Sequence, residues 1–144
     1  MEKQNVLSIG LLSDDRPAVF FDMNNGHGTF LYNHNIREVL VIKDKEGGFT
    51  TTESKNEATG TMFQYDSLRC EYPKTGDNVF ATLLTAKYPS QTESKLWNEY
   101  KSAELGLLDV SFKKPYEDFL KDRLSIRSSV NTDCETCNIP LNYE

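Results

Sequence analysis

The chain has few of the residues that build disulfide frameworks and metal sites. Its 144 residues include three cysteines and two histidines. An odd number of cysteines fits a reducing compartment better than a disulfide scaffold. A chain of this length buries roughly two-thirds of its unfolded surface, so folding requires neither a metal nor a disulfide. The sequence therefore predicts a compact domain held by an apolar core, or a small β part and a small α part that share one core.

Long apolar runs and concentrated positive charge are also missing. No run approaches the ~20 residues of a membrane span, and residues 1–5 lack the apolar region and cleavage motif of a secretory signal. The net charge is −6, and the lysines and arginines form no stripe. We therefore expect neither nucleic acid nor an anionic membrane surface as a partner.

The first half of the chain favours β-structure. Short segments rich in β-branched and aromatic residues alternate with turn-forming segments such as Asn24–Gly28 and Lys43–Gly48. The segments predicted as strands are 6–12, 18–21, 29–32, 37–42, 49–53, 61–65 and 68–72. Five to seven short strands with tight turns indicate an antiparallel sheet.

From Thr75 onward the apolar period changes from two to about 3.6 residues, which is typical of helices. The predicted helices cover 75–88, about 90–106 and 115–130, with Pro89 and Gly106 as terminators and Pro115 in a first turn. The fold class is α+β: an antiparallel β-rich N-terminal half (1–72) packed with a C-terminal three-helix segment (73–130). Residues 131–144 lose the period and are expected to form an irregular tail.

Cys134 and Cys137 form the sharpest local motif, Cys-x-x-Cys. Two thiolates at this spacing can bind one zinc ion or form a redox pair. A structural zinc site needs four ligands, and only Cys70, His27 and His34 remain to complete one. The alternative is a pair of reduced, exposed thiols in the tail. We therefore predict no cofactor and no metal, and keep these residues as candidate ligands.

His27 and His34 are the candidates for acid–base chemistry. They bracket the predicted strand 29–32, and Asp22 lies nearby in the sequence. A catalytic histidine needs a nucleophile or carboxylate within hydrogen-bond reach. The segment Asn24–Gly28 is glycine-rich, but a strand follows it where a phosphate loop requires a helix. A hairpin turn with two solvent-facing histidines is the competing interpretation, and we assign no catalytic residue.

A resemblance extends through the helical half. It is carried by Tyr65-Asp66, Tyr72-Pro73, the run DNVFATLLTAKYPSQTESKLWNEYKSAELGLL (77–108) and the run PYEDFLKDRLSIRSSV (115–130). This succession resembles small accessory proteins, tail- or virion-associated, of phages and prophages of gut Bacteroidetes. The resemblance implies a non-enzymatic structural or assembly protein of a phage or integrated element. Its partners would be other phage proteins or further copies of itself, in the bacterial host cytoplasm or in the virion.

Three hypotheses therefore follow. The first is a protein-interaction or assembly protein, which the resemblance and the lack of a convincing catalytic set favour. The second is a small enzyme that uses the region of His27 and His34. The third is a zinc or redox module that uses Cys134 and Cys137. The aromatic residues Trp97, Tyr100, Tyr116 and Phe119 lie at helical spacing and are interpreted as core.

Overall fold

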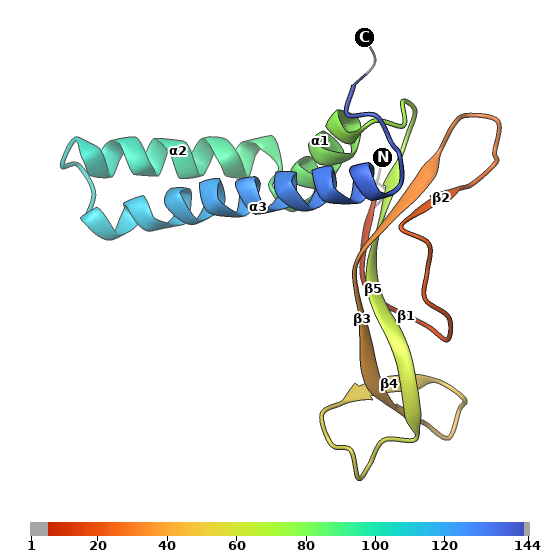
Figure 1. Cartoon of the computed structure of the whole chain (residues 1–144). Helices are drawn as coiled ribbons and strands as arrows, with labels where there is room; N and C mark the ends of the chain where they lie inside the picture. Colours follow the sequence, from red (N-terminus) through yellow and green to blue (C-terminus); the bar gives the residue numbers. More distant parts are fainter. Residues whose placement is uncertain (1–5, 143–144) are drawn as a thin grey trace. The chain divides into compact units, whose positions relative to one another are not determined.

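A computed structural model describes residues 6–142 of the chain (Figure 1). The chain forms two compact units that divide between Tyr72 and Pro73. Residues 1–5, on which the expectation about a secretory signal rests, lie outside the described residues. None of the helices in the described part is both long and apolar enough to cross a membrane.

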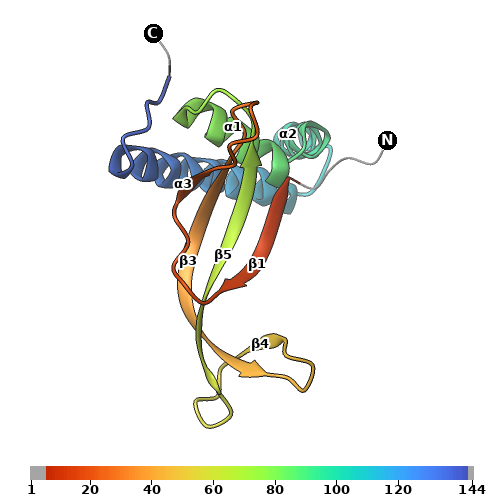
Figure 2. The same ribbon diagram turned by 90° about the vertical axis from the view of Figure 1, so that its right-hand side faces the viewer.

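The N-terminal unit is a five-stranded antiparallel sheet, as the sequence predicts. Figure 2 shows β5 lying between β1 and β3. Two short strands, β2 and β4, both pair with β3. The strands are β1 (Leu7–Ser13), β2 (Phe20–Asp22), β3 (Phe30–Lys43), β4 (Phe49–Thr52) and β5 (Gly60–Cys70).

The two long strands each replace two predicted ones. The sequence places a break between 32 and 37, but β3 runs through it without ending. Asn35 has a positive φ of 53°, and the pairing with β5 shifts register between His34 and Arg37. The strand thus absorbs its turn-forming residue as a β-bulge, which inserts a residue without ending the ladder. The predicted break after Tyr65 is likewise absent, because β5 continues to Cys70.

A second bulge lies on the other side of β5. The pairing of β1 with β5 shifts register between Ser8 and Leu11, where Gly10 has a φ of 73°. The carboxylate of Asp66 accepts a hydrogen bond from the Gly10 backbone N–H at 3.1 Å and another from Asn35 Nδ2 at 3.2 Å. One side chain on the central strand therefore holds both irregularities in place.

The C-terminal unit contains the three expected helices. They are α1 (Gly76–Lys87), α2 (Ser90–Glu104) and α3 (Lys114–Thr136), with a 3₁₀ turn, η1 (Val110–Lys113), before α3. Thr75 caps α1, since its hydroxyl accepts from the Asn78 N–H at 3.2 Å. Pro89 separates α1 from α2, and Pro115 occupies the first turn of α3, as the sequence predicts.

Polar contacts at both ends of α1 accompany its packing against α3. At one end, Arg127 pairs with Asp77 at 2.5 Å, and its guanidinium lies 4.9 Å from the centre of the Phe80 ring. At the other end, the Tyr88 hydroxyl donates to Asp122 at 2.6 Å. The buried apolar residues of these two helices include Val79, Phe80, Leu83, Phe119, Ile126 and Val130.

The expected irregular tail is partly wrong. Helix α3 continues to Thr136, six residues beyond the predicted end. The following segment then folds back onto α1: the carbonyls of Pro140 and Leu141 accept from the backbone N–H groups of Gly76 and Asp77 at 2.8 and 2.9 Å. The first N–H groups of a helix have no intrahelical partner, so the C-terminal segment completes the cap of α1.

Candidate functional site

The glycine-bearing loop is a hairpin turn. It joins β2 to β3, which pair through Asp22 and Phe30. Asn24, Gly26 and Gly28 all have positive φ, the conformation that turn residues of this kind supply. The loop leads into a strand, so its N–H groups are not backed by a helix N-terminus as in a phosphate cradle. The hairpin turn is therefore confirmed, but the expectation of two solvent-facing histidines is wrong for His34, which is half-buried in β3.

The two histidines lie at separate places in the β unit. His27 is exposed in the hairpin turn, whereas His34 lies inside β3. His34 lies four residue steps along the strand from Phe30, about 13 Å at ~3.3 Å per residue. The His34 ring stacks on Tyr32 with ring centres 4.7 Å apart, and its Nδ1 lies 3.2 Å from the Tyr32 carbonyl oxygen. The structure does not bring the two imidazoles together.

The carboxylates nearest these histidines have structural partners. Asp66 is the cross-strand neighbour of His34, but its two oxygens accept from Gly10 and Asn35. Near the hairpin turn, the Glu71 carboxylate accepts a hydrogen bond from the Thr29 hydroxyl at 2.6 Å. That hydrogen bond, with smaller contributions from neighbouring positive charge, lowers the pKa of Glu71. A carboxylate held ionised in this way is a weak general base.

The cysteines are not exposed thiols in a flexible tail. Cys134 is fully buried in the last turn of α3, and Cys137 is half-buried at its C-cap. Burial raises the pKa of Cys134 and raises that of Cys70 to about 12. A helix C-terminus also disfavours a thiolate. Within residues 6–142, no three histidine, cysteine or carboxylate side chains lie close enough to hold a metal ion.

The aromatic residues of α2 and α3 form a chain of ring contacts. Trp97, Tyr100 and Tyr116 lie with ring centres 5.2 to 6.0 Å apart, and Tyr116 continues to Phe119 at 5.9 Å. Phe119 is buried, Tyr100 and Tyr116 are half-buried, and Trp97 is exposed at the rim. The cluster therefore packs the two helices together. The prediction of core residues holds for Phe119, whereas Trp97 is exposed.

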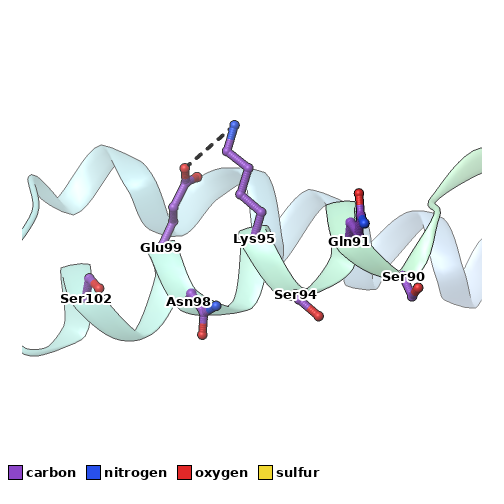
Figure 3. Close-up of a pocket in the computed structure, with 7 residues that line it drawn as sticks. All are labelled: Ser90, Gln91, Ser94, Lys95, Asn98, Glu99 and Ser102. Atoms are coloured by element: carbon purple, nitrogen blue, oxygen red, sulfur yellow. Dashed lines mark ion pairs between the residues drawn. The ribbon is translucent and has the colours of Figure 1, made fainter.

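A shallow hollow runs along the outer face of α2 (Figure 3). Its lining residues all come from this one helix: Ser90, Gln91, Ser94, Lys95, Asn98, Glu99 and Ser102. The charged pair in it is an i,i+4 contact at 4.0 Å between the exposed Lys95 and the half-buried Glu99. Pockets that hold small molecules are concave and mostly apolar. This hollow is open and is formed by a single helix, so it is not a concave pocket and is an ordinary solvated helix surface.

The most unusual surface is the turn between α2 and α3, residues 105–112, which we name the hairpin tip. Figure 1 shows it as the loop that joins the two antiparallel helices at the end away from α1. Leu105 and Leu107 are both 74% exposed, and Val110 is 68% exposed. Leu108 and Phe112 are exposed as well. Five large apolar side chains within eight residues form the kind of patch that marks an interaction site.

The hairpin tip begins with a well-formed helix cap. The Gly106 N–H donates to the Ala103 carbonyl at 3.1 Å, and the Leu107 N–H donates to the Ser102 carbonyl at 2.8 Å. With Gly106 at a φ of 79°, this is a Schellman motif. In such a cap the residue at the Leu107 position commonly packs on the residue at the Ser102 position. Here Ser102 offers no apolar side chain for this contact, and Leu107 remains in solvent.

The second half of the hairpin tip is also ordered by hydrogen bonds. The Asp109 carboxylate accepts from the Ser111 N–H at 3.1 Å, and the Asp109 carbonyl accepts from the Phe112 N–H at 3.0 Å. These bonds begin the 3₁₀ turn. Hydrogen bonds to the Asp109 carboxylate, first from the Ser111 side chain and then from the Ser111 backbone, lower its pKa. The apolar side chains are therefore carried by defined backbone on both sides of Leu108.

Sequence reasoning missed the hairpin tip. It ended the second helix at about Gly106, whereas α2 ends at Glu104 and Leu107 lies beyond the cap. The available signal was Gly106, since a glycine at the end of a helical pattern places the residues after it outside the helix. Two leucines directly after that glycine, followed by Asp109 as a cap, indicate an exposed apolar turn.

No protein-family model, curated protein or solved structure matches this chain. The fold and the surface define its class: an α+β protein with an antiparallel sheet, a three-helix unit and an exposed apolar hairpin tip. The resemblance of the helical half to phage accessory proteins stays a prediction.

Proposed function

We propose that this chain is a non-enzymatic protein-interaction or assembly protein whose binding surface is the hairpin tip. One observation carries the proposal: Leu105, Leu107 and Val110 are each more than two-thirds exposed on a turn that hydrogen bonds hold in place. Exposing them costs solubility and gains the fold nothing, because the Schellman cap does not use Leu107 as its apolar contact. Covering these side chains with another protein surface would recover their burial energy.

The resemblance to phage accessory proteins supports a more specific version of this proposal. In it, the chain belongs to a phage or integrated element of gut Bacteroidetes, and the partner is another phage protein or a second copy. The protein would act in the host cytoplasm or in the virion. The enzyme and zinc hypotheses gain no support from residues 6–142, where the candidate histidines lie apart and no metal-binding cluster forms.

Site-specific photo-crosslinking in the producing cell tests the proposal. A photoreactive amino acid replaces Leu107 in one variant and Ser128, an exposed residue of α3, in a control variant. We expect a discrete crosslinked product from position 107 and none from position 128. If positions 105, 107 and 110 all give only the uncrosslinked chain, the hairpin tip is not a binding surface and the proposal is wrong.

A further inference from the structure

We infer that the hairpin tip packs against the hairpin tip of a second copy of this chain, which gives a weak two-fold symmetric dimer. This inference rests on the proposed function and names the partner. In a two-fold contact the same patch is used on both subunits, so the patch must be complementary to itself. The charge, the rigidity and the size of the hairpin tip all bear on that requirement.

The charge around the hairpin tip favours a second copy. The whole chain carries a net charge of −6, and two copies repel each other over most of their surface. Residues 101–118, however, hold three lysines and four acidic residues, close to balance. Two of the lysines already have acidic neighbours: Lys101 with Glu104 at 3.3 Å, and Lys114 with Asp118 at 3.2 Å. Two copies that meet at this part of the chain therefore repel each other little.

The same balance disfavours a lipid surface. Binding to anionic lipid depends on clustered lysine or arginine, each of which adds about 1 kcal/mol near the surface. The hairpin tip has apolar side chains but no basic excess. Its rim instead carries both signs, with Glu104 and Asp109 near the first part and Lys113 and Lys114 after the second. Mixed charge around an apolar centre is the arrangement that a two-fold contact can satisfy with itself.

Rigidity lowers the cost of association. The Schellman cap at Gly106 and the Asp109 turn fix the backbone on both sides of Leu108. Binding therefore does not have to order a flexible loop first, a cost that otherwise reduces affinity.

The size of the patch sets the strength of the contact. Five exposed side chains present an apolar patch on the order of 500 Å², compared with ~800 Å² per partner in a stable interface of standard size. The dimer is therefore weak, and its population depends on protein concentration.

Sedimentation velocity of the full chain, from about 1 to about 500 µM, tests this inference. We expect the weight-average mass to rise with concentration toward twice that of the chain. Leu107→Ser should weaken the dimer about tenfold, and Leu107→Ser with Val110→Ser about a hundredfold. Leu124→Ser is the matched control, because Leu124 lies on α3 outside the hairpin tip and is 67% exposed. It should leave the dissociation constant within about twofold of the wild-type value. Far-UV circular dichroism confirms that each variant is folded.

Several outcomes overturn the inference, and crosslinking separates them from failure of the proposed function. If the chain stays monomeric up to ~500 µM and position 107 crosslinks to a different protein, the second copy is ruled out as the partner. The hairpin tip then remains a binding surface. If the chain stays monomeric and position 107 gives no crosslink, both the dimer and the proposed binding surface are ruled out. If the chain floats with neutral and anionic phospholipid vesicles and the Leu107→Ser variant does not, the partner of the hairpin tip is a lipid surface. Equal weakening by Leu124→Ser places the dimer contact elsewhere on the hairpin.

Discussion

Replacing Gly76 with alanine tests whether the C-terminal segment is part of the helical unit. Gly76 is the first residue of α1, and alanine in a helix is normally favoured over glycine by up to ~1 kcal/mol. Here a Cβ atom would lie 2.7 Å from Leu141 Cδ2 and 3.3 Å from both Cys134 Sγ and the Leu141 Cα. The side-chain end can rotate away, but the backbone cannot do so without moving the segment. We therefore expect Gly76→Ala to displace residues 139–142 and to destabilise the protein.

The magnitude follows from the hydrogen bonds that this displacement breaks. The N–H groups of Gly76 and Asp77 donate to the segment at 2.8 and 2.9 Å. Each such bond contributes about 1 kcal/mol net. The gain in helix propensity offsets part of this loss, which leaves a net destabilisation of about 1 kcal/mol.

Urea unfolding followed by tryptophan fluorescence measures the effect. Trp97 is the single tryptophan of the chain and lies in α2, so its signal reports on the helical unit. With a slope of ~1 kcal/mol per molar urea, the midpoint should fall by about 1 M. In a chain that ends at Asn138 both contacts with Leu141 are absent and only the 3.3 Å approach to Cys134 Sγ remains. That side chain has to shift slightly, so Gly76→Ala should instead stabilise by up to about 0.5 kcal/mol. If Gly76→Ala changes the free energy of unfolding in the same direction in both chains, the segment does not cap α1 and the reasoning is refuted.

Three further predictions concern other contacts. Asp66→Ala should lower the stability of the β unit by about 2 kcal/mol in thermal melts, because both bulges lose a hydrogen bond, whereas Asp66→Asn should cost less. Tyr88→Phe should cost about 1 kcal/mol near pH 7. The hydrogen bond to Asp122 raises the pKa of Tyr88 to about 12; its stabilisation is therefore complete below about pH 10 and is lost as the pH rises toward 12. Urea midpoints at pH 8 and pH 11 should thus differ more in the wild type than in Tyr88→Phe. Alkylation of the native chain at pH 8, followed by mass spectrometry, should modify Cys137 first, because Cys70 and Cys134 are buried. Labelling of Cys70 or Cys134 at the same rate as Cys137 would contradict this prediction.

Much of the fold could be predicted because its signals are local. The change of period near Thr75, the helix-ending Pro89 and the first-turn Pro115 fix three helices in their observed order. The antiparallel sheet follows equally from short strand-forming segments separated by turn residues. The strand count was less certain, because Asn35 is a turn former whose positive φ the sheet accommodates as a bulge. The Asp66 contact that accompanies this bulge comes from another strand and has no local signal.

The candidate sites were predicted less well, because burial and convergence depend on tertiary structure. The Cys-x-x-Cys spacing does not show that Cys134 is buried next to Gly76, since this follows from the packing of α3 against α1. The sequence places a strand between His27 and His34, but it does not show that β3 continues through His34 and that its ring stacks on Tyr32. The hairpin tip was missed because Gly106 was interpreted only as the end of a helix, and the exposure of the leucines around it depends on tertiary structure.

A crosslinking scan across the hairpin tip tests the central claim most directly. The photoreactive residue is moved through positions 102 to 114, and the yield of crosslinked product is measured at each one in the producing cell. A binding surface at the hairpin tip predicts maxima at Leu105, Leu107 and Val110, where the exposed apolar side chains lie, and low yield at Ser102. A flat profile, or one no higher than at the control position Ser128, would contradict the claim that this turn is the surface through which the protein acts.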